Sequence, residues 1–147
     1  MKFGLLGESI SHSKSPQLFK AGYPLGEHSY ELLDFKSAKE GIEYAISNGF
    51  TAINVTTPFK DTAAGLANAL DGSSKRAWAS NLLYFKSGKI YGFNTDYCGV
   101  KDSLKDYVSE GMRAVILGCG GAGRAAAVAL KDMGVDVIIS TRDEFTG

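Results

Sequence analysis

The stretch Thr51-Ala52-Ile53-Asn54-Val55-Thr56-Thr57-Pro58-Phe59-Lys60 joins a strand pattern to a helix pattern and carries three polar side chains at the junction. Residues 51–55 are mostly apolar and rich in β-branched side chains, which is typical of a buried strand. Pro58 has a fixed φ and no N–H group, so we expect it in the first turn of the helix that follows. The strand end therefore presents an amide at Asn54, a hydroxyl at Thr56 and an ammonium at Lys60.

This strand end has two interpretations. In α/β sheets, ligands bind in the crevice beyond the carboxyl ends of strands. An amide, a hydroxyl and a cation at that place would suit a small polyhydroxylated anion. The alternative is an ordinary strand-to-helix turn with a solvated lysine, and the stretch alone does not decide between them.

The residues before this stretch also alternate between strand and helix patterns. Strands are predicted over 2–6 and 28–35, and a helix is predicted over 38–48. Ser15 is a good N-cap and Pro16 a good first helical residue, so a short helix is expected there. Capping would explain Ser15 but leaves the hydroxyl of Ser13 unexplained.

The residues after this stretch continue the pattern and then change it. A helix is predicted over 61–70, so the first part reads β-α-β-α-β-α and implies a largely parallel sheet. Residues 82–85 and 89–93 flank Lys86-Ser87-Gly88 and predict a β-hairpin. Asn81 precedes the hairpin, where it could equally be a turn residue. Asp96 follows the hairpin, and either it or Thr95 would cap the next helix.

A glycine-rich segment follows the predicted strand over 113–117. The segment Gly118-Cys119-Gly120-Gly121-Ala122-Gly123 matches G-x-G-x-x-G, and a helix over 125–130 and a strand over 135–139 come after it. This pattern inside a β-α-β unit of about 30 residues indicates dinucleotide binding at Gly118, Gly120, Gly121, Ala122 and Gly123. The alternative is a glycine-rich turn needed only for tight helix–strand packing.

The end of the last predicted strand distinguishes between two cofactors. NAD sites usually have Asp or Glu there, which holds the ribose 2′-hydroxyl. Here Ser140-Thr141-Arg142 provides hydroxyls and a guanidinium that suit a 2′-phosphate, so NADP is favoured. Asp143 points the other way, because it could repel that phosphate.

These patterns predict an α/β protein with two domains. Residues 1–110 form a mixed, mostly parallel sheet flanked by helices, which is the expected substrate-binding and catalytic domain. Residues 111–147 form an incomplete Rossmann β-α-β unit, since a dinucleotide fold uses two such halves and the second is absent. We therefore expect the sequence to be part of a longer chain.

Composition excludes several other classes of protein. The chain has 147 residues, with 16 basic and 16 acidic side chains, so nothing suggests a nucleic-acid or membrane partner. Its two cysteines form neither a metal-binding spacing nor a disulfide framework, and we expect no metal site. No export signal is recognisable, which favours the cytoplasm.

Taken together, the motifs resemble the shikimate dehydrogenase family over nearly the whole chain. Ser13-Lys14-Ser15-Pro16 is similar to its serine motif, residues 54–60 resemble its N-V-T-x-P-x-K, and residues 92–96 match its G-x-N-T-D. Residues 79–81 match its A-V-N-T in part, the glycine segment aligns with its G-x-G-G-A, and residues 141–143 depart from its N-R-T.

The resemblance implies NADP-dependent, reversible reduction of 3-dehydroshikimate to shikimate, in a monomer or homodimer. It makes Lys60 and Asp96 the catalytic pair. It makes substrate-binding residues of Ser13, Ser15, Asn54, Thr56, Lys60, Asn81 and Asp96, and cofactor-binding residues of the glycine segment with Thr141 and Arg142. The alternatives are a dehydrogenase that also accepts quinate and a non-catalytic ligand-sensing module on the same fold. The chain as given is expected to have little or no activity by itself.

Overall fold

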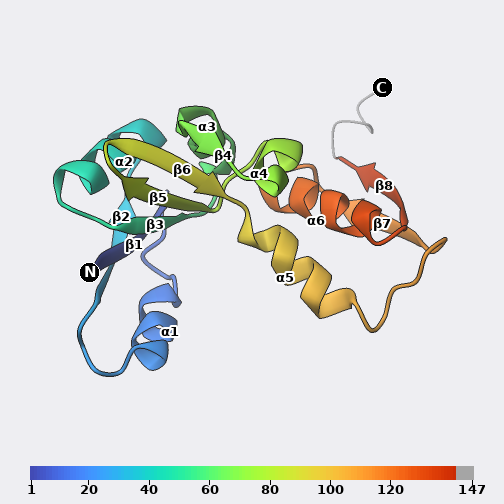
Figure 1. The fold of residues 1–147 in the computed structure, drawn as a ribbon, viewed down its shortest axis with the longest axis horizontal. Coiled ribbons are helices and arrows are strands. Elements are labelled where there is room, and N and C mark those ends of the chain that lie inside the picture. Colours follow the sequence, from blue (N-terminus) through green and yellow to red (C-terminus); the bar gives the residue numbers. More distant parts are fainter. Residues whose placement is uncertain (142–147) are drawn as a thin grey trace.

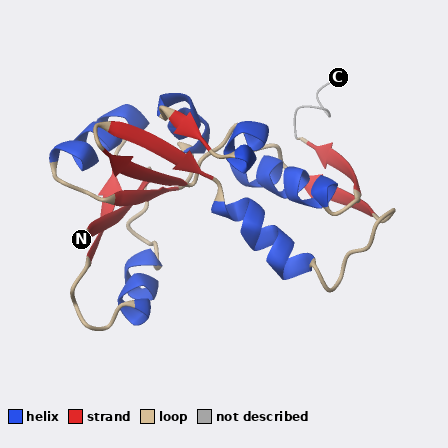
Figure 2. Cartoon of the chain, viewed as in Figure 1, coloured by secondary structure: helices blue, strands red, loops and turns tan. Residues whose placement is uncertain are grey.

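The computed structural model describes residues 1–141, and its helices and strands alternate along most of that range (Figures 1 and 2). In chain order the elements are β1 (Lys2–Gly7), α1 (Ser15–Gly22), β2 (Ser29–Asp34), α2 (Ala38–Ser47), β3 (Ala52–Val55), α3 (Lys60–Leu66), β4 (Ala69–Leu70), α4 (Gly72–Ala77), β5 (Leu82–Lys86), β6 (Lys89–Phe93), α5 (Thr95–Leu104), β7 (Arg113–Leu117), α6 (Gly121–Asp132) and β8 (Asp136–Ser140).

The first part of the chain forms a six-stranded mixed sheet. Its strand order is β2-β1-β3-β5-β6-β4, and β1 pairs in parallel with both β2 and β3. The predicted hairpin of β5 and β6 turns at Ser87 and Gly88, both with positive φ, and β5 runs antiparallel to β3. The predicted α/β fold class, with a mostly parallel sheet followed by a β-α-β unit, is therefore confirmed.

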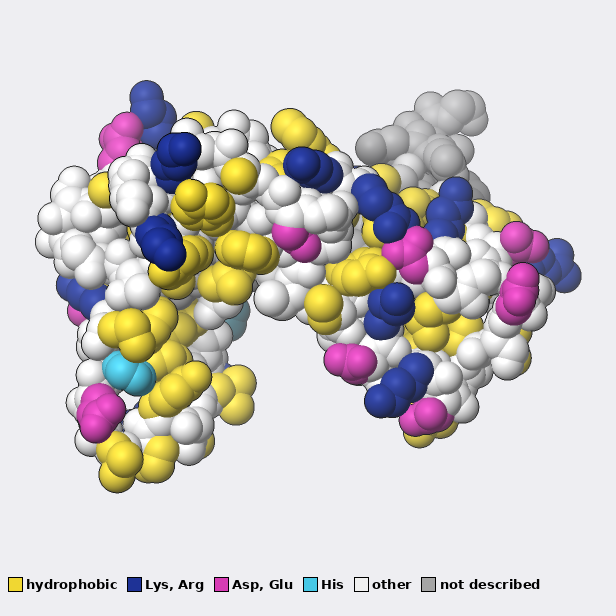
Figure 3. All heavy atoms as spheres, viewed as in Figure 1, with side chains coloured by type: hydrophobic (Ala, Val, Ile, Leu, Met, Phe, Trp, Pro, Cys, Tyr) yellow, Lys and Arg dark blue, Asp and Glu magenta, His cyan; other side chains and the backbone are white. Residues whose placement is uncertain are grey.

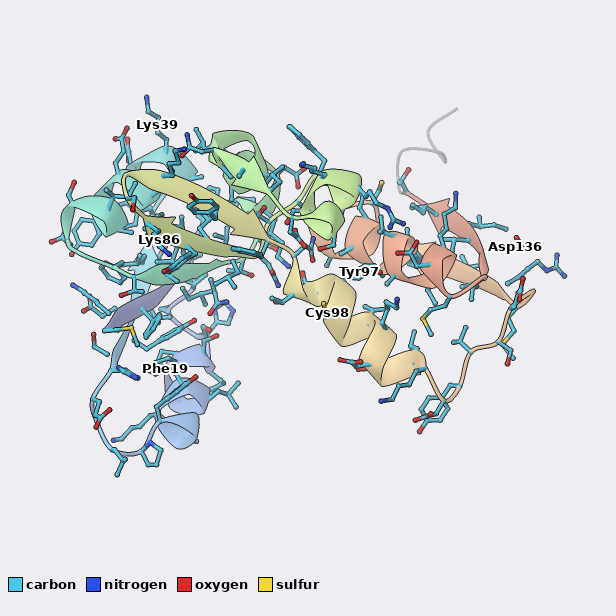
Figure 4. All side chains as sticks on the ribbon, in the orientation of Figure 1. Phe19, Lys39, Lys86, Tyr97, Cys98 and Asp136 are labelled. Carbon is cyan, nitrogen blue, oxygen red and sulfur yellow. The ribbon has the colours of Figure 1, made fainter. Side chains whose placement is uncertain are left out.

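The two faces of this sheet are covered by different helices. One face carries Leu6, Ile53 and Leu83, which are almost completely buried in one apolar cluster with residues of α2 and α3. The opposite face meets α1, where the ring of Phe19 lies 4.8 Å from the ring of Tyr30 (Figure 4). The strands near the centre are thus held from both sides, which fixes where their ends lie.

The last described part is a separate two-stranded parallel sheet, β7-β8, with α6 packed against it. Small residues join it to the first part, because Ala77, Ala79 and Ala125 form one buried cluster. Arg76 of α4 and Asp132 of α6 add a two-pronged ion pair with N–O distances of 2.6 and 2.8 Å. Figure 1 shows α5 and α6 side by side between the two sheets.

The predicted helix that follows Pro58 differs from the observed one at both ends. Pro58 is not in the first turn of a helix: the N–H of Phe59 donates to the carbonyl of Thr56 at 2.9 Å, which closes a turn, and α3 begins at Lys60. The helix predicted over 61–70 ends at Leu66. Asn68 then exchanges hydrogen bonds with the backbone of Ile90, at 2.7 and 2.8 Å, and draws the chain into the sheet as β4.

The predicted caps and one segment also need correction. Ser15 is the first residue of α1 and not its cap, and its N–H donates to the Ser13 hydroxyl at 3.2 Å. The cap of α5 is Asn94, which accepts from the N–H of Tyr97, so neither Thr95 nor Asp96 is used for this purpose. The segment before Asn81 contains a short helix, α4, which ends at Ala77 and was not predicted.

Candidate functional site

Three polar residues meet at one edge of the six-stranded sheet because of strand direction. Asn54 lies near the end of β3, and Asp96 follows the end of β6. Asn81 instead precedes β5, but β5 is antiparallel to β3, so its beginning lies at the same edge. The N–H of Val55 donates to the carbonyl of Asn81 at 2.8 Å, which ties these two strand ends together.

Lys60 and Asp96 form the centre of this edge. The Lys60 Nζ donates to the Asp96 Oδ2 at 2.6 Å, and the two side chains are 16% and 30% exposed. Asn81 donates to the other carboxylate oxygen of Asp96 at 2.8 Å, and it also exchanges hydrogen bonds with Thr95. Both oxygens of Asp96 are therefore held, so the carboxylate is oriented toward the ammonium before any ligand arrives.

Ser13, Ser15 and Asn54 belong to a second polar cluster with Tyr30. The Ser13 hydroxyl donates to that of Ser15 at 3.1 Å, and the Tyr30 hydroxyl donates to the Asn54 amide oxygen at 2.8 Å. Burial raises the pKa of Tyr30, although a hydrogen bond from Ser15 acts in the opposite direction. Tyr30 therefore stays protonated and can donate.

Sequence reasoning did not single out Tyr30. It lies in β2, which is far from Asn54 in sequence, and a tyrosine in a strand pattern is most simply interpreted as packing. Side chains alternate between the two faces of a strand, and the strand registers place Tyr30 of β2 on the same face of the sheet as Asn54 of β3. The contact could therefore be suggested only once the strand order was known.

A cleft of about 610 Å³ opens beside this cluster. Its wall includes the hydroxyl residues Ser13, Ser15 and Thr56 together with Glu8 and His12. Figure 3 shows the molecule hollowed between the lobe that contains α1 and the lobe that contains α5. The cleft therefore has hydroxyl groups that can meet a polar ligand, and three of them belong to residues predicted to bind substrate.

A second cleft, of about 420 Å³, lies on the other side of Thr57 and Pro58, which line both clefts. Lys60 and Asp61 line it together with Leu117, Gly118 and residues 120–123. Lys60 thus borders the glycine segment as well as the polar edge of the sheet.

The glycine segment has the geometry that a dinucleotide pyrophosphate requires. A Cβ on Gly123 would lie 2.2 Å from the Gly118 carbonyl oxygen, so the tight turn permits no side chain there. Gly120 is the N-cap of α6, has open space where its Cβ would be, and makes no side-chain cap bond. Backbone N–H groups at this helix end are therefore available to an anion.

The remaining predicted cofactor residues, Thr141 and Arg142, follow β8 in the sequence. Thr141 is half-buried there, whereas Arg142 and the opposing Asp143 lie outside the described residues. Within residues 1–141 no three His, Cys, Asp or Glu side chains are grouped closely enough to hold a metal ion. In the same range, no helix has the length and apolar composition needed to cross a bilayer.

Both parts of the chain are similar to known protein families. Residues 5–83 match the family described as the shikimate dehydrogenase substrate binding domain. Residues 108–146 match the family described as the acetohydroxy acid isomeroreductase, NADPH-binding domain. A protein of Halobacterium salinarum named shikimate dehydrogenase (NADP(+)) is 39% identical over 146 residues, which are 95% of this chain and 54% of that protein. The chain thus spans about half the length of this relative.

Solved structures agree with these matches. A shikimate dehydrogenase from Peptoclostridium difficile superposes with a TM-score of 0.89 at 33% identity, over 99% of this chain and 57% of that one. A shikimate 5-dehydrogenase from Thermus thermophilus, solved with NADP(H) and shikimate, superposes with a TM-score of 0.82 at 33% identity, over 97% of this chain and 56% of that one.

Proposed function

This chain belongs to the family of shikimate dehydrogenase substrate binding domains, and on that premise we propose that its protein reduces 3-dehydroshikimate to shikimate reversibly with NADP. The observation that carries the proposal is the contact of 2.6 Å between Lys60 and Asp96. Lys60 also lines the cleft of the glycine segment, which shares Thr57 and Pro58 with the cleft of the hydroxyl residues. A purely ligand-sensing module has no need of a proton donor oriented in this way.

Lys60 is the proposed proton donor. Reduction of a ketone creates negative charge on its oxygen, and an ammonium group can stabilise that charge and deliver a proton to it. Asp96 accepts a hydrogen bond from the Lys60 ammonium and orients it, while Asn81 holds the carboxylate. In the reverse direction the same pair accepts the proton of the alcohol.

Ser13, Ser15, Asn54, Thr56 and Asn81 are the proposed substrate-binding residues. Two serine hydroxyls in the cleft suit a carboxylate, because each can donate one hydrogen bond to an anionic oxygen. The Tyr30 hydroxyl occupies the Asn54 amide oxygen, so the Asn54 NH₂ group is left to donate to a hydroxyl of the ligand. This set of hydrogen-bond donors suits a ring that carries one carboxylate and several hydroxyls.

The proposed cofactor residues are Gly118, Gly120, Gly121, Ala122 and Gly123, with Thr141 and Arg142. NADP, when bound, supplies or accepts the hydride of the reaction. The residues of the glycine segment hold a pyrophosphate against the N-terminus of α6, and the hydroxyl of Thr141 is suited to a 2′-phosphate. The relatives named for NADP support this choice over NAD.

Four further expectations remain proposals. The division into domains 1–110 and 111–147 is supported by the two separate sheets. A cytoplasmic location also stays a proposal. The protein is a monomer or homodimer, and we expect this chain alone to turn over poorly because it spans about half of its relatives.

The test is NADP⁺-dependent oxidation of the alcohol by the complete gene product, with shikimate and quinate as parallel substrates and NAD⁺ as the second cofactor. We expect shikimate with NADP⁺ to be preferred. Equal rates with quinate would support the dehydrogenase of broader specificity. Binding of shikimate without any turnover would support the sensing module and overturn the proposed reaction.

A further inference from the structure

Arg124 connects the glycine segment to the part of the chain that carries Lys60. It lies in the first turns of α6, and its Nη1 donates to the carbonyl of Cys119 within the glycine segment at 2.7 Å. Its Nε donates to the carbonyl of Ala77 at 2.7 Å, and its Nη2 donates to that of Trp78 at 3.2 Å. The same Nη2 forms an ion pair with Asp61 of α3.

These partners explain why an arginine is suited to this position. The last carbonyls of a helix have no partner within it, and α4 ends at Ala77. A planar guanidinium with five N–H groups can satisfy such carbonyls and a carboxylate at once. Lysine has the charge but lacks the fixed fork, so it cannot reproduce the four contacts.

The ion pair with Asp61 has an electrostatic consequence. Asp61 lines the same cleft as residues 120–123, and its side chain is 53% exposed. An unpaired carboxylate there would repel a pyrophosphate bound at the N-terminus of α6. Arg124 offsets that charge and does so without occupying the cleft, since its own N–H groups point to protein oxygens.

The glycine segment is also in direct contact with Lys60. A Cβ on Gly121 would lie 3.0 Å from the Cβ of Lys60 and 3.1 Å from that of Ala79. The segment therefore rests directly on the first residue of α3, and any shift of one changes its distance from the other.

We propose that Arg124 is a positioning residue that holds the cofactor-binding glycine segment at a fixed distance from Lys60 and neutralises Asp61 at the edge of the nucleotide cleft. The inference rests on the proposed function and extends it to a residue outside the Lys60–Asp96 pair. Arg124 lines neither cleft and acts through its contacts with Cys119 and Asp61.

The chain offers a matched control for a general loss of rigidity. Arg76 also bridges the two parts of the structure through a two-pronged ion pair, with Asp132. Neither Arg76 nor Asp132 lines the cleft of the glycine segment. Arg76→Met therefore removes a bridge of the same kind without changing the nucleotide cleft.

The experiment compares Arg124→Met, Arg124→Lys, Arg76→Met and the double variant Arg124→Met with Asp61→Asn, in the complete gene product. NADP⁺ binding is measured by calorimetry at fixed ionic strength, and the shikimate KM is measured separately. The part of the tryptophan emission that Trp78→Phe removes reports on the contact itself, since Trp78 is the only tryptophan of residues 1–147. Hydrogen bonds to charged groups are typically worth enough to change an affinity by about 10-fold to 100-fold.

We expect Arg124→Met to weaken NADP⁺ binding by about 10-fold or more, with a shifted Trp78 emission and an unchanged shikimate KM. Arg124→Lys should recover only part of this loss, the double variant should bind NADP⁺ more tightly than Arg124→Met, and Arg76→Met should bind it like the wild type. Wild-type affinity in Arg124→Met, an equal loss in Arg76→Met, or no recovery in the double variant would each overturn the proposal. A wild type that binds NADP⁺ but does not oxidise shikimate would overturn only the proposed function.

Discussion

The Lys60 cluster, made of Lys60, Asn81 and Asp96, lies next to the glycine segment, and the two present different kinds of chemical group. At the Lys60 cluster, side chains from three strand ends satisfy one another, so that Asp96 has both oxygens occupied. At the glycine segment, the missing side chains are what matters, because Gly123 leaves room for a turn and Gly120 leaves open space. The first site is arranged by hydrogen bonds between side chains, and the second by backbone geometry.

The two sheets that support these sites also differ, in how deeply their apolar side chains are buried. The six-stranded sheet has helices on both faces near β1 and β3, and its central residues Leu6 and Ile53 are buried. In the β7-β8 sheet, Val115, Leu117 and Ile138 are 63%, 85% and 56% exposed on the face away from α6. Each site can therefore be weakened separately, and the effects should fall on different measured quantities.

The largest effect is expected from Lys60→Ala. Removing a general acid typically costs about 10²–10⁴-fold in rate, so kcat should fall by that factor while the shikimate KM changes little. Steady-state kinetics of shikimate oxidation by the complete gene product measures both. Lys39→Ala is the control, since Lys39 is an exposed residue of α2 whose closest acidic partner, Glu43, is 3.9 Å away (Figure 4). Near-normal turnover in Lys60→Ala would contradict the assignment of Lys60.

Gly123→Ala should damage the second site and leave the first intact. Its Cβ would lie 2.2 Å from the backbone oxygen of Gly118, so the turn must open. We expect NADP⁺ affinity to fall by about 10-fold or more, as the backbone N–H groups lose their alignment, while shikimate binding persists. Gly99→Ala is the control, because Gly99 lies in α5 with open space around it. Equal NADP⁺ affinities of Gly123→Ala and Gly99→Ala in calorimetry would contradict the role proposed for Gly123.

Tyr30→Phe should have a smaller effect, confined to the first site. It removes the hydrogen bond to Asn54 and keeps the ring against Phe19. A hydrogen bond between neutral groups is worth about 0.5–1.5 kcal/mol, so the shikimate KM should rise by about 2-fold to 12-fold with kcat little changed. Tyr84→Phe is the control, as Tyr84 belongs to the same sheet and its hydroxyl bonds no other residue of the described range 1–141. A reduced kcat with a normal KM would assign Tyr30 a different role.

Asp132→Asn should change only stability, and in a pH-dependent way. Hydrogen bonds from Arg76 and then Tyr97 lower the pKa of Asp132 to about 2. A lowered pKa means that this stabilisation is fully present above the unfolded value of about 3.9 and is lost as the pH falls through about 2. Thermal unfolding from pH 2 to 6 should show a Tm difference from wild type of at most about 4 °C that vanishes toward pH 2.

The control for this prediction is Asp136→Asn. Asp136 is exposed at the start of β8 (Figure 4) and is not paired within residues 1–141. Its Tm difference from wild type should be small at every pH. A Tm difference for Asp132→Asn that grows as the pH falls would have the wrong sign and would refute the ion pair as the cause.

Local patterns predicted the elements well where consecutive residues determine them. The hairpin over 82–93 was recognisable because Ser87 and Gly88 supply a tight turn between two strand patterns. The strand over 113–117 and the glycine segment were located correctly because both depend on neighbouring residues alone. The cap of α5 was misassigned because Asn94, Thr95 and Asp96 are all residue types that cap helices well. In the structure Asn81 forms hydrogen bonds with Thr95 and Asp96, which leaves Asn94 as the cap.

The sequence by itself determined which chemical groups are available: an ammonium, carboxylates, hydroxyls and a glycine-rich helix start, each next to a strand. The tertiary structure decided which of them meet. Strand order and the antiparallel direction of β5 bring Asn81 to Asp96, the pairing of β1 with both β2 and β3 brings Tyr30 to Asn54, and the packing of α6 brings Arg124 to Asp61. The physical reason is that turns and caps depend on residues close in sequence, whereas these contacts join residues that only the packed sheet and helices bring within hydrogen-bond distance.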